Sequence, residues 1–196
     1  TLQDRADVAM GIAAREEVFA VAHTAPFPVL DGLPAFGPQD PDAPVFRVPG
    51  DHSTIQAAID AAPAGATILV GPGTWTENLR INAKHMDLVA EMGPAATILD
   101  GRAADAPTVH VVSAAASGTR IAGFTITGGL GDGYESGSDK HDTVHYGGGL
   151  NVLHSAVVTA HGCVMWRNGY RGHAIGTAFG GGAHVGAGSA LFMRSC

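Results

Sequence analysis

The sequence predicts an all-β fold in which short strands repeat along the chain as the turns of a solenoid. After Pro63 the chain consists of short runs rich in β-branched residues and separated by glycines, and no helical pattern of any length interrupts them. The stretch "GGGLNVLHSAVVTAHGC" from Gly147 is followed 33 residues later by "GGGAHVGAGSALFMRSC" from Gly180. The two copies share three glycines, a valine at the sixth place and a closing cysteine, which indicates an internal repeat.

Nine runs have the length and composition of strands, and the predicted coils begin at residue 66. The predicted strands are 66–70, 78–81, 86–90, 96–99, 108–112, 119–127, 150–153, 156–160 and 190–193. The letters "ATIL" occur at residues 66 and 96, which we take as a second sign of the repeat.

A period of 33 residues also suits ankyrin repeats, which are pairs of helices. The β-branched run at 156–160 opposes a helix at that place, so a strand-based solenoid fits better. Because equivalent positions stack in successive turns, we expect Val152 to lie beside Val185 and Cys163 beside Cys196. We expect both cysteines to be buried and reduced, since parallel Cβ vectors would strain a disulfide.

The N-terminal quarter of the chain has a different composition. Residues 1–23 have the apolar spacing of an amphipathic helix. Residues 24–49 contain seven prolines, which predict an extended, Pro-rich arm or linker. The apolar residues of this arm suggest that it packs on its own domain or docks on a partner.

The solenoid itself is expected to span residues 50–196. It begins with a cap helix at 53–62, in which Ser53 and Gln56 have the spacing of a capping box. A Gly-rich loop insertion is predicted at 128–146, between two coils.

Two segments carry a family resemblance. "STIQAAIDAAPAGATILVGPGTWTENLRI", followed by "MDLVAEMGPAATILDG", resembles the opening of right-handed parallel β-helix proteins of the pectate-lyase-like superfamily. In those proteins a short helix caps the first coil and a "PGTY.E" turn follows; here Trp75 takes the aromatic place and Glu77 the acidic one. The later pattern "GGGL…S…C…RN", ending in Arg167 and Asn168, resembles the repeats of large bacterial surface β-helices.

The resemblance covers residues 45–196 and implies a right-handed parallel β-helix with an N-terminal capping helix, preceded by the Pro-rich arm. It also implies an extracellular, cell-surface or periplasmic location. It does not select a function, because the superfamily holds lyases, hydrolases, esterases, epimerases, adhesins and passive stalks.

An enzyme of this fold would align acids and bases on one sheet over successive coils. The polar candidates on the predicted strands are Arg80, Asp87, His110, Arg120 and, at a strand margin, Asp100. None of them forms the local signatures of the lyases, hydrolases or epimerases, so we interpret them as solvent-facing strand residues. The alternative is a carbohydrate-active enzyme, binding a polysaccharide, whose active site is degenerate or lies beyond residue 196.

The predicted insertion contains the main concentration of acidic residues. Asp132, Glu135, Asp139 and Asp142 offer the oxygen ligands that calcium prefers, which makes them candidate calcium ligands. Their spacing matches neither a tandem β-roll motif nor an EF-hand loop, so a solvated loop is the alternative interpretation.

The formal net charge of −7 disfavours nucleic acid as a partner, and no apolar run is long enough to span a bilayer. These features together predict a non-catalytic secreted or surface β-helix. It would act as a structural, adhesive or assembly module, or as an accessory subunit of a larger complex. Because the printed sequence stops within a coil at Cys196, we expect a protein partner or further coils to cap the open C-terminal edge.

Overall fold

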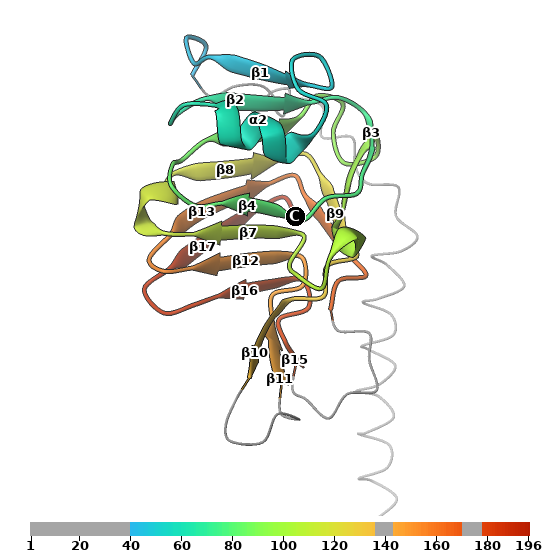
Figure 1. The fold of residues 1–196 in the computed structure, drawn as a ribbon, viewed down its shortest axis with the longest axis vertical. Helices are drawn as coiled ribbons and strands as arrows, with labels where there is room; N and C mark the ends of the chain where they lie inside the picture. The colour runs from blue at the N-terminus through green and yellow to red at the C-terminus, as the bar shows by residue number, and fades with distance from the viewer. Residues whose placement is uncertain (1–39, 136–142, 170–177) are drawn as a thin grey trace, which may run out of the picture. The chain divides into compact units, whose positions relative to one another are not determined.

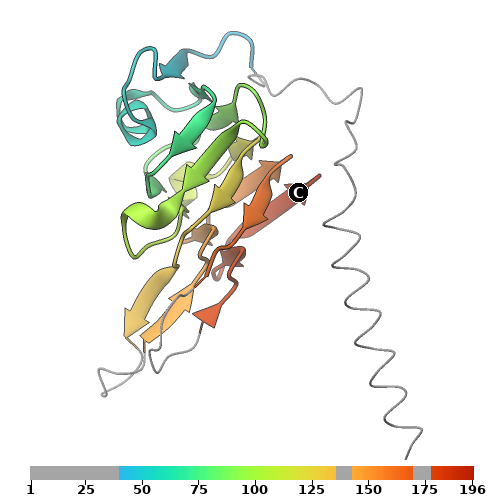
Figure 2. The same ribbon diagram turned by 90° about the vertical axis from the view of Figure 1, so that its right-hand side faces the viewer.

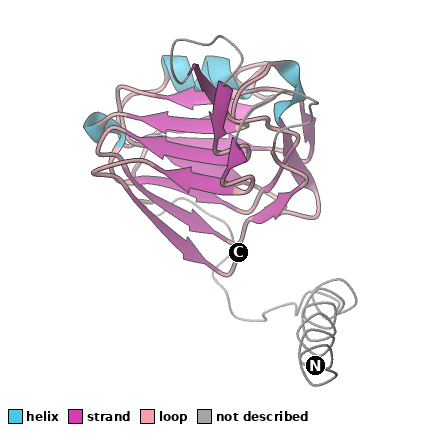
Figure 3. Ribbon diagram, turned by 90° about the horizontal axis from the view of Figure 1, so that it is seen from below, coloured by secondary structure: helices cyan, strands magenta, loops and turns pink. Residues whose placement is uncertain are grey.

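The computed structural model describes residues 40–135, 143–169 and 178–196. The predicted helix at 1–23 therefore lies outside the described residues. Most of the regular secondary structure described is strand, arranged mainly in parallel sheets, with one α-helix and two short 3₁₀ turns, Gly101–Ala103 and Ala114–Ala116 (Figure 3). The prediction of an all-β fold with parallel strands is confirmed at this level.

Three parallel sheets form the body of the domain. The first sheet consists, in order, of β1 (Val45–Val48), β2 (Thr67–Val70), β5 (Asp87–Ala90), β8 (Thr119–Ala122), β13 (Val157–His161) and β17 (Ala190–Arg194). The second sheet consists of β3 (Gly73–Trp75), β6 (Thr97–Asp100), β9 (Thr125–Thr127) and β14 (Val164–Trp166). The third sheet consists of β4 (Leu79–Ile81), β7 (Val109–Val112), β12 (Leu150–Leu153) and β16 (Ala183–Val185).

The chain visits these three sheets in the same order each time. One passage through the first, second and third sheets, here called a circuit, runs β2–β3–β4, then β5–β6–β7, then β8–β9–β12 and finally β13–β14–β16. Strand β17 returns to the first sheet. Each circuit pairs with the one before it, so β4, β7, β12 and β16 follow one another down one face in Figure 1, and the strands stack in the same sense in Figure 2.

The 33-residue repeat corresponds to one circuit. Val152 pairs with Val185 in the third sheet, as the sequence predicts. The two "ATIL" runs, by contrast, do not stack: Thr67 lies in the first sheet, opposite Asp87, while Thr97 lies in the second sheet, opposite Gly73. The interpretation of "ATIL" as a repeat is wrong, because the same apolar letters suit strands of different sheets.

The repeated glycine triplets lie where the backbones of neighbouring circuits approach each other closely. The Gly149 N–H donates to the carbonyl oxygen of Gly181 at 3.0 Å. A Cβ placed on Gly148 would lie 2.7 Å from the oxygen of Gly129 and 2.8 Å from that of Gly181, closer than real contacts allow. The triplet is therefore explained by backbone packing between circuits.

Apolar side chains from the three sheets share one core. The predicted single strand at 119–127 is in fact two strands, β8 and β9, because Gly123 adopts a φ of +76° and turns the chain from the first sheet into the second. The turn brings Phe124, the largest fully buried side chain, into the core. Each of the nine runs predicted as strands overlaps at least one strand.

The N-terminal end of the sheets is closed by α2 (Ile55–Ala61), which lies within the predicted cap helix at 53–62. The predicted capping box of Ser53 and Gln56 is wrong. The N-cap is Thr54, whose hydroxyl accepts from the Ala57 N–H at 3.2 Å, while the Gln56 side chain points to other partners. Ser53 and Thr54 are both good N-cap residues, so the sequence alone favours neither.

Two predicted boundaries change. The last residues of the predicted arm at 24–49 form β1, which pairs in parallel with β2, so the first sheet begins before residue 50. The predicted loop insertion at 128–146 contains β10 (Asp132–Glu135) and β11 (Thr143–Tyr146), which pair as an antiparallel hairpin. Strand β11 also pairs in parallel with β15 (Ala178–Phe179), which completes a fourth sheet.

Candidate functional site

The polar residues that the sequence singled out do not come together. Asp87 and Arg120 lie opposite each other on β5 and β8 of the first sheet, and their carboxylate and guanidinium groups are 3.0 Å apart. Their side chains are 15% and 8% exposed. This ion pair links two neighbouring circuits of the first sheet.

Asp100 lies at the end of β6, in the second sheet. Its carboxylate accepts from the Arg102 Nε–H at 2.9 Å and from the Arg102 backbone N–H at 3.2 Å. It thereby caps the 3₁₀ turn that follows. This carboxylate is thus also engaged in holding local structure.

A row of four polar side chains crosses the third sheet. Arg80, His110, Asn151 and His184 occupy equivalent positions on β4, β7, β12 and β16. Arg80 Nη1 is 3.4 Å from His110 Nδ1, and His184 Nδ1 is 2.9 Å from Asn151 Oδ1. The row contains no carboxylate, so it lacks the paired acid and base of a glycosidase.

Of this row, only Arg80 and His110 were predicted as polar strand residues, although the sequence also contains a signal for Asn151 and His184. Asn151 and His184 hold the fifth place in the two "GGG" repeats, directly after the shared glycines and one apolar residue. Asn151 is fully buried, and the ring of Tyr146 lies 4.7 Å from that of His184. In this row, Asn151 is therefore buried in the protein, and the ring of His184 packs against that of Tyr146.

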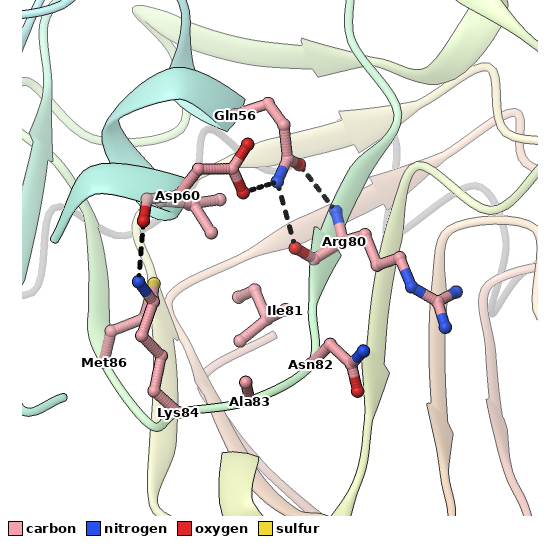
Figure 4. A pocket seen from close by; sticks show the side chains of 9 residues that line it. Gln56, Asp60, Arg80, Ile81, Asn82, Ala83, Lys84 and Met86 are labelled. Carbon is pink, nitrogen blue, oxygen red and sulfur yellow. Dashed lines mark hydrogen bonds between the residues drawn. The ribbon is translucent and has the colours of Figure 1, made fainter. Parts of the chain in front are cut away.

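A cavity of about 350 Å³ lies between α2 and β4 (Figure 4). The Gln56 amide donates to the Asp60 carboxylate at 2.8 Å and to the Arg80 carbonyl at 3.2 Å, and its oxygen accepts from the Arg80 N–H at 2.8 Å. The Lys84 ammonium donates to the carbonyl oxygens of Asp60, at 2.9 Å, and Ala62. These contacts fasten the helix to the sheets, and Figure 4 shows the guanidinium of Arg80 pointing away from them.

The predicted calcium ligands are only partly within the described structure. The backbones of Asp132 and Glu135 lie on β10, opposite Tyr146 and Thr143 of β11. Asp139 and Asp142 lie outside the described residues. Across the part of the chain that the structure describes, no three His, Cys, Asp or Glu side chains are grouped closely enough to hold a metal ion. The calcium site stays a prediction.

The C-terminal end of the three sheets leaves core positions uncovered. Within the described ranges, β14, β16 and β17 each pair with a single neighbour. We call this surface, formed by the free edges of the three strands, the open end. Val152 and Ala160 are completely buried, whereas Val185 and Met193, which follow them in the stack, are 41% and 48% exposed. The apolar column of the core thus continues to the surface.

Two large aromatic side chains border the open end. Phe192 follows Thr159 in the first sheet and Trp166 follows Thr127 in the second, and both rings are exposed. The guanidinium of Arg167 lies 5.3 Å from the centre of the Trp166 ring, a cation–π contact. Exposed aromatic, aliphatic and arginine side chains on one surface are typical of protein interfaces.

The two cysteines are neighbours, as the stacking predicts. Both are free thiols, and the Cys163 N–H donates to Cys196 Sγ at 3.4 Å. Cys163 is buried, but Cys196 is exposed, so the expectation that both are buried is wrong for Cys196. Cys196 follows β17, one of the three strands that form the open end.

Comparison with known proteins gives no match, whether to a family model, to a curated protein sequence or to a solved structure. Among the described residues, no helix is both long enough and apolar enough to cross a membrane.

Proposed function

We propose that this chain is a right-handed parallel β-helix that serves as a non-catalytic assembly module and associates with a second copy of itself through the open end. The resemblance of the sequence and the regular order of the three sheets support the fold. The resemblance also supports a secreted or cell-surface location. The observation that carries the function is the exposure of Val185 and Met193 at positions that are fully buried one circuit earlier.

The two ends of the sheets are unlike, and this favours a pair over a filament. At the N-terminal end of the described structure β1, β3 and β4 also have a single neighbour each, but α2 covers the core there with Ile55 and Ile59 buried. An open end set head-to-tail against it would meet this helix and not an exposed core. Two open ends can meet about a two-fold axis, which gives a closed dimer. Such an arrangement covers both open ends at once.

Strand β17 suits this arrangement. If it pairs antiparallel with its own copy about Phe192, Leu191 of one copy faces Met193 of the other, and Ala190 faces Arg194. No like charges oppose each other. The same axis brings β14 of one copy to β16 of the other, and these strands have equal length. In such a dimer the free edges of all three strands therefore find partners, and the apolar columns of the two copies meet.

The dispersal of the polar candidates supports a non-catalytic role. Arg80 and His110 lie on the third sheet, the Asp87–Arg120 pair on the first, and Asp100 at the end of a second-sheet strand. The carboxylates among them are occupied by structural contacts.

The proposal is tested by the molar mass of the chain in solution, measured by light scattering after size exclusion over a range of concentrations. We expect a dimer that the substitution Met193→Lys converts to a monomer, because a lysine would be buried against Leu191 of the other copy. The matched control is Met92→Lys, at an exposed residue of the β5–β6 connection, which should leave the dimer intact. A wild-type chain that remains monomeric at every concentration would contradict the proposed function.

A further inference from the structure

We propose that Cys163 and Cys196 form a redox-active dithiol, which exchanges with small-molecule disulfides and closes to a reversible disulfide between the last two circuits. Cys196 is the attacking thiol and Cys163 the resolving one. This inference does not depend on self-association of the chain.

The two thiols occupy equivalent places one circuit apart. Cys163 follows β13 and Cys196 follows β17, and the two strands pair in register. Cys163 Sγ lies 3.5 Å from the carbonyl oxygen of Ile121, while Cys196 Sγ lies 3.6 Å from that of Ala160, the residue paired with Ile121. Since the Cys163 N–H donates to Cys196 Sγ, the second sulfur is held against the backbone of the first residue.

The two thiols differ in exposure in the way that a resolving pair requires. Cys196 is exposed and can meet a dissolved disulfide, whereas Cys163 is 1% exposed and can be reached only from its neighbour. A disulfide needs the two Cβ atoms to lie about 3.8 Å apart, and the parallel Cβ vectors of stacked positions strain the bond, which makes it easier to reduce and hence reversible. Cys196 is exposed in the described structure, and its sulfur already contacts the Cys163 backbone.

The pKa values of the two thiols also differ in the way that these roles require. The hydrogen bond between the thiols raises the pKa of Cys163, and burial raises it further. The same contact lowers the pKa of Cys196 to about 6, with the Cys163 backbone N–H and other backbone groups adding to the effect. Of the two thiols Cys196 therefore has the lower pKa and is the nucleophile, and Cys163 is the one that retains its proton.

The exchange balances with an oxidised small thiol, such as glutathione disulfide, as the oxidant. The Cys196 thiolate attacks one sulfur of that disulfide, which breaks the S–S bond, forms a mixed disulfide on Cys196 and releases one small thiolate. Cys163 then loses its proton and attacks Cys196 Sγ, which forms the Cys163–Cys196 bond and expels the second small thiolate. In total, two protein thiols are oxidised and one small disulfide is reduced to two thiols.

The test equilibrates the chain with mixtures of reduced and oxidised glutathione, blocks the remaining thiols and measures the intact mass. We expect the wild type to lose both thiols together and to carry no glutathione. Half-formation should need an oxidised-glutathione concentration at least about ten-fold lower for the folded chain than for the chain in urea, because folding holds the sulfurs together. A folded chain that keeps glutathione on Cys196, or that stays a dithiol throughout the series, would overturn the proposal.

Matched variants separate the two roles. Cys163→Ala should accumulate the mixed disulfide on Cys196, while Cys196→Ala should react at least about ten-fold more slowly with glutathione disulfide, because its remaining thiol is buried. The rate of Cys196 alkylation should rise with pH about a midpoint near 6 in the wild type. Cys163→Ser keeps a hydroxyl donor and should hold this midpoint closer to the wild-type value than Cys163→Ala does. Equal midpoints in the two variants would show that the neighbouring donor plays no part.

Discussion

Apolar side chains lie at both ends of the three sheets, but they are buried at the N-terminal end and exposed at the open end. At the N-terminal end, Ile55 and Ile59 of α2 are buried, and the helix covers the interior of the first circuits. At the open end, Met193 and Val185 project from the last circuit and remain about half exposed. Apolar content alone therefore does not close an end of this fold.

The closed end differs by the polar contacts that complete the helix. The Glu77 carboxylate accepts from the Ile55 and Gln56 N–H groups at 2.9 and 3.0 Å, and the Lys84 ammonium donates to carbonyl oxygens at the other end of α2. These contacts satisfy backbone groups that a helix leaves unpaired. At the open end no helix among the described residues covers the core, and fully burying each apolar side chain there would contribute about 1.5–3 kcal/mol.

The largest effect should distinguish a glycine inside the stack from its equivalent at the open end. A Cβ on Gly149 would lie 2.4 Å from the carbonyl oxygen of Gly182, a backbone atom that cannot move aside cheaply. We expect Gly149→Ala to lower the free energy of unfolding by about 2–4 kcal/mol. Gly182→Ala would meet only Met165, at 3.8 Å, and should change it by less than about 1 kcal/mol. Urea denaturation measures both, and equal losses would contradict the account of the glycine triplets.

A second comparison uses two leucines that point inward from the first sheet. Leu88 on β5 is completely buried, and Leu191 on β17 is only partly buried. Truncation of Leu88 to alanine leaves a cavity and should destabilise the chain by about 2–5 kcal/mol. Leu191→Ala, measured on the monomeric Met193→Lys background, should cost about 1 kcal/mol or less. A loss at Leu191 as large as that at Leu88 would show that the open end is as well packed as the interior.

A smaller effect is expected from the cap of α2. Replacing Glu77 by Gln removes the charge that faces the first N–H groups of the helix and should cost about 1 kcal/mol. Glu91→Gln is the control, because Glu91 is exposed and its N–H group, rather than its carboxylate, pairs with the neighbouring circuit. Thermal unfolding should separate the two variants by a few degrees. Identical melting temperatures would remove Glu77 from the explanation of the closed end.

Much of the fold could be predicted because β-branched runs bounded by glycines identify the longer strands. Three strands of three residues each, β3, β14 and β16, were missed, and β3 and β16 contain, or directly follow, glycine. The prediction that the two "ATIL" runs are repeats of each other was wrong, because a short apolar run does not indicate the sheet to which it belongs. Which strands pair between circuits depends on the lengths of all the turns in a circuit, and the sequence of a single strand does not determine it.

The candidate site was harder to predict than the fold. The exposure of Met193 depends on the absence of a covering circuit among the described residues, and strand composition does not report this. The contact between Cys163 and Cys196 followed from the repeat, but their difference in exposure did not. Asn151 and His184 share the fifth place of the repeat, just as Val152 and Val185 share the sixth. Their pairing could therefore be predicted from the sequence in the same way.

The most direct test of the central claim is hydrogen exchange along β17. The Ala190 N–H donates to the Ala156 oxygen at 2.9 Å, so the alternation of the strand points the N–H groups of Leu191 and Met193 away from β13. If two open ends pair, these two amides should exchange at least about ten-fold more slowly at high protein concentration than at high dilution, and Met193→Lys should abolish the difference at Leu191. Fast exchange of both amides at every concentration would contradict the account.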